Sequence, residues 1–152
     1  MIQKALLHVF SFLLSKLSLN SVHTIGIFVG KLYFFFSKKN YKFLRDNIQN
    51  SKIFEHSIIE DAIKENINEL GKGIIETFYL WGSSQEQSLK LIRNIIGEKY
   101  LINAERTGKG IIFLTPHLGC FEITSLYYGS KRPITVMYRK ARKIWMSDFM
   151  IN

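Results

Sequence analysis

A histidine and a glutamate, His117 and Glu122, stand five positions apart, just after an apolar run and a proline. A neutral imidazole can take a proton from a hydroxyl near neutral pH, and a carboxylate beside it can hold its tautomer and stabilise the imidazolium. The pair therefore predicts general-base chemistry in which the nucleophile is the substrate's own hydroxyl. The alternative is a histidine that merely caps the next helix, with Glu122 as a favourable anion in its first turn.

The elements around this pair decide whether the two side chains can meet. Residues 111–114 form a short β-branched and aromatic run that is typical of a buried strand in a parallel sheet. Pro116 ends the run, which predicts that His117 lies in the following loop and that a helix occupies residues 121–128. Inside one regular helix the two residues would point about 140° apart, whereas a loop followed by a helix lets them face each other. α/β folds place ligands at such strand ends.

The stretch Gly-Lys-Gly-Ile-Ile-Phe-Leu-Thr-Pro-His-Leu-Gly-Cys-Phe-Glu, residues 108–122, resembles the His-x4-acid block of the lipid A biosynthesis acyltransferases. These are the lauroyl and myristoyl transferases of Gram-negative inner membranes. Residues 133–139 resemble the family's next strand and its Tyr-Arg pair. Three positions depart from the family, which usually has Asn-Trp at residues 120–121 and a proline at residue 140.

The resemblance implies a glycolipid O-acyltransferase that moves a fatty acyl chain from an acyl carrier protein thioester to a hydroxyl of a lipid A precursor. It implies His117 as the catalytic base and Glu122 as its partner, with no metal and no cofactor. Tyr138 and Arg139 are expected to bind the substrate, since a guanidinium suits phosphate oxygens, and amides near Leu118 and Gly119 to bind the oxyanion. Arg139 could equally be one more exposed arginine in a basic run.

Two other interpretations stay open. One is a lysophosphatidate-type acyltransferase, whose block usually ends in Asp. The other is an inactive truncated or split-gene fragment that stays bound to the membrane. The resemblance places the protein at the cytoplasmic face of the cell inner membrane.

The amino-acid composition of the chain is compatible with acidic binding partners. The formal net charge is +9 in a chain that is 47% hydrophobic. Such a chain suits anionic membrane lipid or nucleic acid, but its aromatics lie in apolar runs and not among the lysines, so we expect no nucleic acid. The single cysteine, Cys120, excludes an internal disulfide and a cysteine-based zinc site.

The N-terminal region, residues 1–45, is predicted to be a membrane-associated helical segment. Its two apolar stretches, residues 5–19 and 22–36, are each shorter than the roughly 20 residues of a spanning helix. We expect one to be inserted or tilted and the other to lie in the interface; a buried helical hairpin is the alternative. A basic cluster follows and favours a cytoplasmic location: Lys38, Lys39, Lys42 and Arg45.

Residues 46–152 are predicted to be the N-terminal part of an α/β acyltransferase domain with a mixed sheet. Capping signals at Ser57 and Ser84 predict two helices, the first with an apolar stripe and the second reaching Gly97. Strands are expected at residues 100–102, 111–114 and 134–138. Because two or three strands are too few for a finished sheet, we expect a truncated domain. The apolar stripe is predicted at Ile59, Ile63, Ile67, Leu70, Ile74, Phe78 and Trp81.

Overall fold

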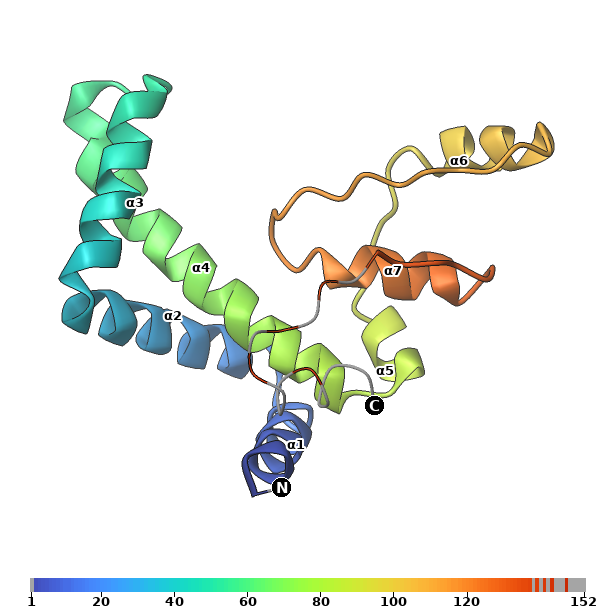
Figure 1. Cartoon of the computed structure of the whole chain (residues 1–152), viewed down its shortest axis with the longest axis horizontal. Helices are drawn as coiled ribbons and strands as arrows, with labels where there is room; N and C mark the ends of the chain where they lie inside the picture. Colours follow the sequence, from blue (N-terminus) through green and yellow to red (C-terminus); the bar gives the residue numbers. More distant parts are fainter. Residues whose placement is uncertain (1, 138, 140, 142, 144–146, 148–152) are drawn as a thin grey trace. The chain divides into compact units, whose positions relative to one another are not determined.

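The computed structural model describes every residue except 1, 138, 140, 142, 144–146 and 148–152. The described residues form seven α-helices and one short 3₁₀ helix (Figure 1). The chain divides into two compact units. We call Met1–Ser83 with Arg139–Asn152 the helical unit, and Ser84–Tyr138 the motif unit. The helices are α1 (Ile2–Leu14), α2 (Leu19–Phe36), α3 (Lys38–Ser51), η1 (His56–Ile58), α4 (Ile59–Gly82), α5 (Gln85–Leu89), α6 (Glu98–Arg106) and α7 (Glu122–Gly129).

The helical unit is built on α4, which contacts α1, α2 and α3. In Figure 1 the first half of α4 runs beside α3. One core cluster there consists of Ile59, Ile63 and Ile67, with four side chains of α2 and α3 packed against it. Their spacing of four residues keeps these isoleucines on one helical face. The four packed side chains are Phe34, Tyr41, Leu44 and Ile48.

The second half of α4 approaches its neighbours backbone to backbone. A Cβ atom added at Gly71 would lie 2.1 Å from the Gly26 carbonyl oxygen of α2. A Cβ atom at Gly82 would lie 2.0 Å from the Ser11 carbonyl oxygen of α1. Only glycine permits these approaches, so the helix crossings depend on small residues as much as on large apolar ones.

Two polar pairs also tie α4 to its neighbours. His23 Nε2 of α2 lies 2.5 Å from Glu76 Oε1, and both side chains are partly buried. Arg45 of α3 pairs with Glu60 at 3.0 Å. The first pair links α2 to α4, and the second links α3 to α4.

In the motif unit α7 contacts α5, and polar side chains link α6 to α7 and to the residue Lys131 after it. Glu98 accepts hydrogen bonds from the Tyr127 hydroxyl and, at 2.6 Å, from Lys131 Nζ. Glu105 accepts one at 3.3 Å from the Tyr128 hydroxyl. Among the described residues of this unit, the only buried side chain is the small polar Ser88.

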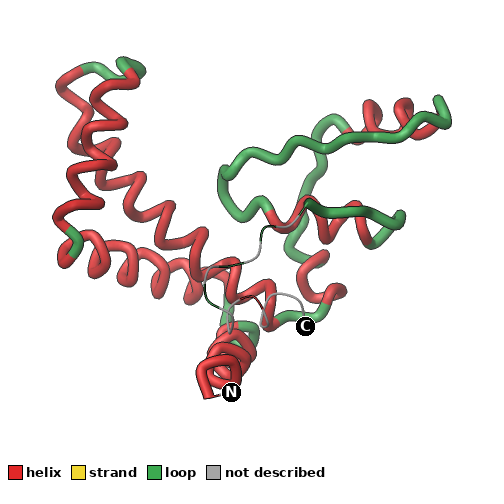
Figure 2. Tube along the Cα trace, in the orientation of Figure 1, coloured by secondary structure: helices red, strands yellow, loops and turns green. Residues whose placement is uncertain are grey.

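The predicted α/β fold with a mixed sheet is wrong for the part of the chain that the structure describes. That part is helix and loop, and Figure 2 shows no strand in it. Residues 111–114 and 134–137 are non-helical chain without ladder partners. A strand exists only when a neighbour takes up its backbone hydrogen bonds, and an apolar run cannot supply that neighbour itself. Ile112 is accordingly 89% exposed and Leu114 90% exposed.

The predicted strand at residues 100–102 is also wrong, because these residues lie within α6. Leucine, alanine, glutamate and arginine give this segment good helix propensity. Glu98 in its first turn and Arg106 in its last turn favour the helix dipole. The helix preference of the flanking residues therefore outweighs the strand preference of residues 100–102.

The predicted α4 is confirmed with two corrections. Ser57 does not cap it, since η1 precedes the helix and Ile58 occupies the N-cap position without a side-chain bond. The stripe follows the prediction as far as Ile67, but Leu70 and Ile74 are exposed. The buried face continues instead through Gly71, Ile75 and Tyr79, where α1 and α2 cross.

The Ser84 cap is confirmed, because its hydroxyl accepts a hydrogen bond from the Gln87 N–H. The helix it begins, α5, ends at Leu89 and does not reach Gly97. The compact units divide after Ser83. The functional division into residues 1–45 and 46–152 stays a prediction.

Candidate active site

The candidate active site is the bend between the extended residues 111–116 and α7, within the motif unit. The Phe113 ring lies 4.6 Å from the Tyr128 ring of α7, which anchors the extended segment on that helix. Gly119 has φ +57°, in the left-handed region that glycine adopts at little cost. The chain can therefore turn sharply between His117 and the start of α7.

His117 lies in this bend and is exposed to solvent, as the Pro116 signal predicts. Its imidazole lies 4.5 Å from the Phe121 ring, centre to centre, with the two planes inclined at 46°. The contact supports one side of the imidazole and leaves the residue accessible. An accessible imidazole can meet a substrate hydroxyl, which a base must do.

Glu122 is the first residue of α7 and is partly buried. The predicted helix is thereby confirmed, with its start one residue later than expected. The Glu122 carbonyl oxygen accepts a hydrogen bond of 2.8 Å from the Ser125 hydroxyl, which braces the first turn. A carboxylate in this turn interacts favourably with the helix dipole, so its position serves the helix as well as any chemistry.

Two backbone amides of the bend differ in their availability. The Leu118 N–H donates to the Pro116 carbonyl oxygen at 2.9 Å, so it is already engaged. For the exposed Gly119 N–H, no acceptor is found within the described part of the chain. Of the two amides expected to bind an oxyanion, only that of Gly119 is open to a ligand.

Of the other two predicted site residues, Arg139 is exposed and belongs to the helical unit. Tyr138 lies outside the described residues. His117, Gly119 and Glu122 thus lie on one short segment that bends into α7. Pairing of the His117 and Glu122 side chains stays a prediction, as does substrate binding by Tyr138 and Arg139.

A second histidine–glutamate pair, His23 with Glu76, was missed by sequence reasoning. Its members stand 53 positions apart, so no local spacing could have indicated it. Within the described residues, no group of three or more histidine, cysteine or acidic side chains could hold a metal ion.

An accessible histidine at a bend, followed by an acid in the first turn of the next helix, has the residue types of a general base and its carboxylate partner. The chain belongs to the bacterial lipid A biosynthesis acyltransferase family, whose family model matches residues 2–152. It is thus an acyltransferase of lipid A synthesis, a process whose enzymes are membrane-associated. No curated protein and no solved structure matches it.

Proposed function

We propose that the protein transfers a fatty acyl chain from an acyl carrier protein thioester to a hydroxyl of a lipid A precursor. The observation that carries the proposal is the family match over residues 2–152, in which the exposed His117 occupies the bend before α7. Both partners are acidic, in keeping with the net charge of +9. Arg139, with Tyr138, would hold an anionic group of the substrate.

His117 would remove the proton of the acceptor hydroxyl as its oxygen attacks the thioester carbonyl carbon. Glu122 would orient the imidazole and stabilise the imidazolium. The Gly119 N–H would donate to the oxyanion of the tetrahedral intermediate. When this intermediate collapses, the carbon–sulfur bond breaks and the imidazolium returns its proton to the leaving thiolate. The products are the acylated glycolipid and the free carrier thiol.

Helix α2 would meet the membrane at its surface. It is long and apolar enough to cross a bilayer by length and composition, and it exposes Phe28, Phe35 and Phe36. Its other side packs along α4, which carries charged residues throughout and cannot enter hydrocarbon cheaply. We infer an interfacial position with the α2 phenylalanines in the lipid. The basic cluster of α3 would bind anionic lipid at the cytoplasmic face of the inner membrane.

The test is acyl transfer by membranes that carry the chain, alone and with any product encoded immediately downstream. The substrates are acyl carrier protein thioesters and a tetra-acylated lipid A precursor. His117→Ala should lower the rate about 10²- to 10⁴-fold, since proton transfer is lost. His56→Ala, which changes an exposed histidine of η1, is the matched control and should retain activity. Full activity of His117→Ala would exclude it as the base.

The pair can be tested as a unit in the same assay. Glu122→Gln should lower the rate, and the double variant should be little slower than His117→Ala alone. Losses that multiply would show that the two residues act independently. Absence of transfer in every preparation of the unchanged chain would favour the inactive fragment.

The Gly119 amide has a separate test. At φ +57° an alanine is strained even though nothing lies within 4 Å of its Cβ atom. Relief of that strain would turn the N–H away, and loss of one oxyanion donor typically lowers the rate about 10²- to 10³-fold. Gly110→Ala, likewise without neighbours and without a positive φ, is the control. An unchanged rate in Gly119→Ala would remove the amide from the mechanism.

A further inference from the structure

The helical unit contains a pocket of about 630 Å³ where α2, α3 and α4 meet. Its volume falls within the roughly 300–1,000 Å³ of small-molecule sites. Aromatic side chains from α2 and α3 form most of its wall, namely Phe34, Phe35 and Tyr41, and Ile67 of α4 completes its apolar lining. The pocket lies within the helical unit, whereas His117 belongs to the motif unit.

Three lysines also line the pocket: Lys31 of α2, Lys38 of α3 and Lys64 of α4. Lys64 pairs with Asp61 at 3.0 Å, and this carboxylate raises the pKa of the lysine. No ion pair of Lys31 or Lys38 occurs within the described part of the chain. The lining of the pocket therefore contains three lysines and no acidic residue, and only Lys64 has an ion-pair partner among the described residues, which leaves the pocket positively charged.

An apolar cavity edged by lysines fits a ligand with an alkyl chain and an anionic head. Free phosphate would gain nothing from the aromatic wall, and a neutral hydrocarbon would gain nothing from the lysines. Exposed phenylalanines continue the apolar surface beyond the pocket, with Phe35 76% exposed and Phe36 75% exposed. Such a surface suits a lipid layer more than water.

We propose that this pocket binds one anionic membrane phospholipid, with an acyl chain along Phe34 and Phe35 and the phosphate at Lys31 and Lys38. Each lysine near a phosphate is a point-charge donor without strict geometry, as a mobile head group requires. The bound lipid would hold the helical unit at the membrane surface at a fixed site, in addition to the general attraction of its basic cluster.

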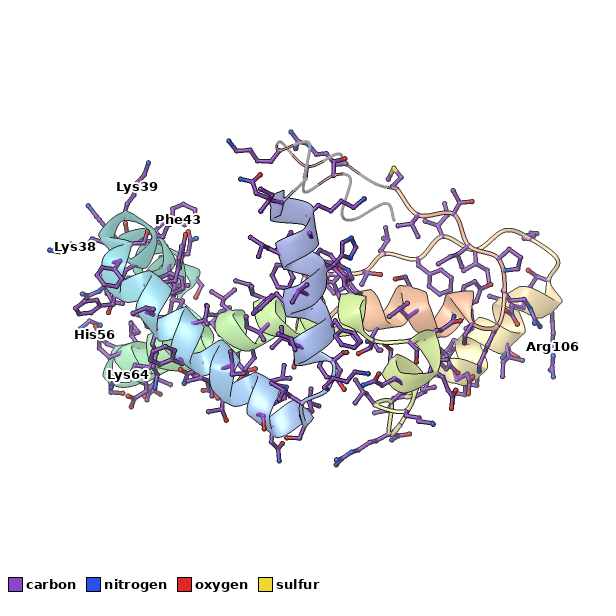
Figure 3. All side chains as sticks on the ribbon, turned by 90° about the horizontal axis from the view of Figure 1, so that it is seen from below. Lys38, Lys39, Phe43, His56, Lys64 and Arg106 are labelled. Atoms are coloured by element: carbon purple, nitrogen blue, oxygen red, sulfur yellow. The ribbon has the colours of Figure 1, made fainter. Side chains whose placement is uncertain are left out.

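The chain supplies a matched pair of variants. Lys31→Gln with Lys38→Gln removes two charges from the pocket, and Lys39→Gln with Lys42→Gln removes two exposed charges of α3 that do not line it. Figure 3 shows Lys38 and Lys64 at the same end of the helical unit, with Lys39 directed away from Lys64. Both double variants have the same net charge, so diffuse attraction to a membrane falls equally.

The experiment is native mass spectrometry of the full chain released from nanodiscs that contain phosphatidylglycerol or phosphatidylcholine. The unchanged chain and the Lys39/Lys42 variant should retain one phosphatidylglycerol, and the Lys31/Lys38 variant should retain at least tenfold less. Phe35→Ser should also lower retention, because it places a polar group in the wall. Inorganic phosphate added at millimolar concentration should not displace the lipid.

Equal losses in the two lysine variants would overturn the proposal in favour of diffuse charge. Equal retention of phosphatidylcholine, or displacement by phosphate, would overturn it in favour of an apolar groove or a soluble-anion site. His117→Ala should retain the lipid fully, so failure of the pocket and failure of the proposed chemistry are separable.

Discussion

The two units of the chain are stabilised by different kinds of contact. In the helical unit, four helices bury large apolar side chains such as Val22, Ile63 and Ile75. In the motif unit no described apolar residue is fully buried, and Glu98 and Glu105 connect α6 to α7 through tyrosines and cations. The residues that indicate the chemistry therefore lie in the unit without a core of its own.

The residues that stabilise the fold and the residues of the candidate site thus lie in different units. Core residues of α4 could be exchanged for others of similar volume. The roles proposed for His117 and Gly119 instead require an imidazole that takes up a proton and a backbone with positive φ. Polar links at the surface are individually weak and sensitive to pH and salt. We expect the helical unit to be the more stable and the motif unit to open more readily.

The largest difference in stability between the two units should appear when one isoleucine in each unit is changed to alanine. Ile63→Ala, at a residue 1% exposed, should destabilise the helical unit by about 2–5 kcal/mol through lost burial and a cavity. Ile112→Ala, at a residue 89% exposed in the motif unit, should change stability by less than about 0.5 kcal/mol. Hydrogen exchange of the full chain, read peptide by peptide, measures both. Similar effects would mean that the motif unit has a core after all.

Replacing one glycine in each unit by alanine should give the next largest difference in stability. Gly71→Ala forces a Cβ atom against the Gly26 carbonyl oxygen, so α2 and α4 must separate at a cost of about 1–3 kcal/mol. Gly110→Ala of the motif unit meets nothing within 4 Å and should be nearly neutral. Faster exchange confined to α2 and α4 would support the close crossing. Unchanged exchange there would contradict it.

The sequence predicts local features well where one residue decides them. Pro116 ends the extended run and puts His117 in a bend, and the Ser84 hydroxyl caps α5. The first half of the α4 stripe is also correct, because its isoleucines recur every four residues. At the next turn the predicted stripe contained Leu70, which is exposed, whereas Gly71 is buried because α2 approaches the α4 backbone there.

Features that depend on distant partners could not be predicted in the same way. Residues 111–114 have side chains that favour a strand, but a strand forms only where a second strand pairs with it. The engaged Leu118 amide and the open Gly119 amide differ only by the geometry of one bend. Neither the His23–Glu76 pair nor the lysine-edged pocket has a sequence signature, because each joins separate helices.

The smallest expected effect concerns the polar link of the motif unit and its dependence on pH. Hydrogen bonds from Lys131 and Tyr127 lower the pKa of Glu98 below its ordinary value of 4.5. A carboxyl group with a lowered folded-state pKa contributes stability that is fully present above the unfolded pKa and is lost as pH falls through the folded one. The link should therefore hold at neutral pH and weaken only below about pH 4.5.

Hydrogen exchange of α6 and α7, corrected for the intrinsic effect of pH, should accelerate as pH falls below about 4.5 and Glu98 takes up a proton. Helix α4, whose core is apolar, should respond less over the same range. In Glu98→Gln the carboxyl is absent at every pH, so exchange should be faster already at pH 6 and its acid dependence smaller. If that variant kept the full acid response, the link would reside in another group, and Glu105 with Tyr128 would be the next pair to change.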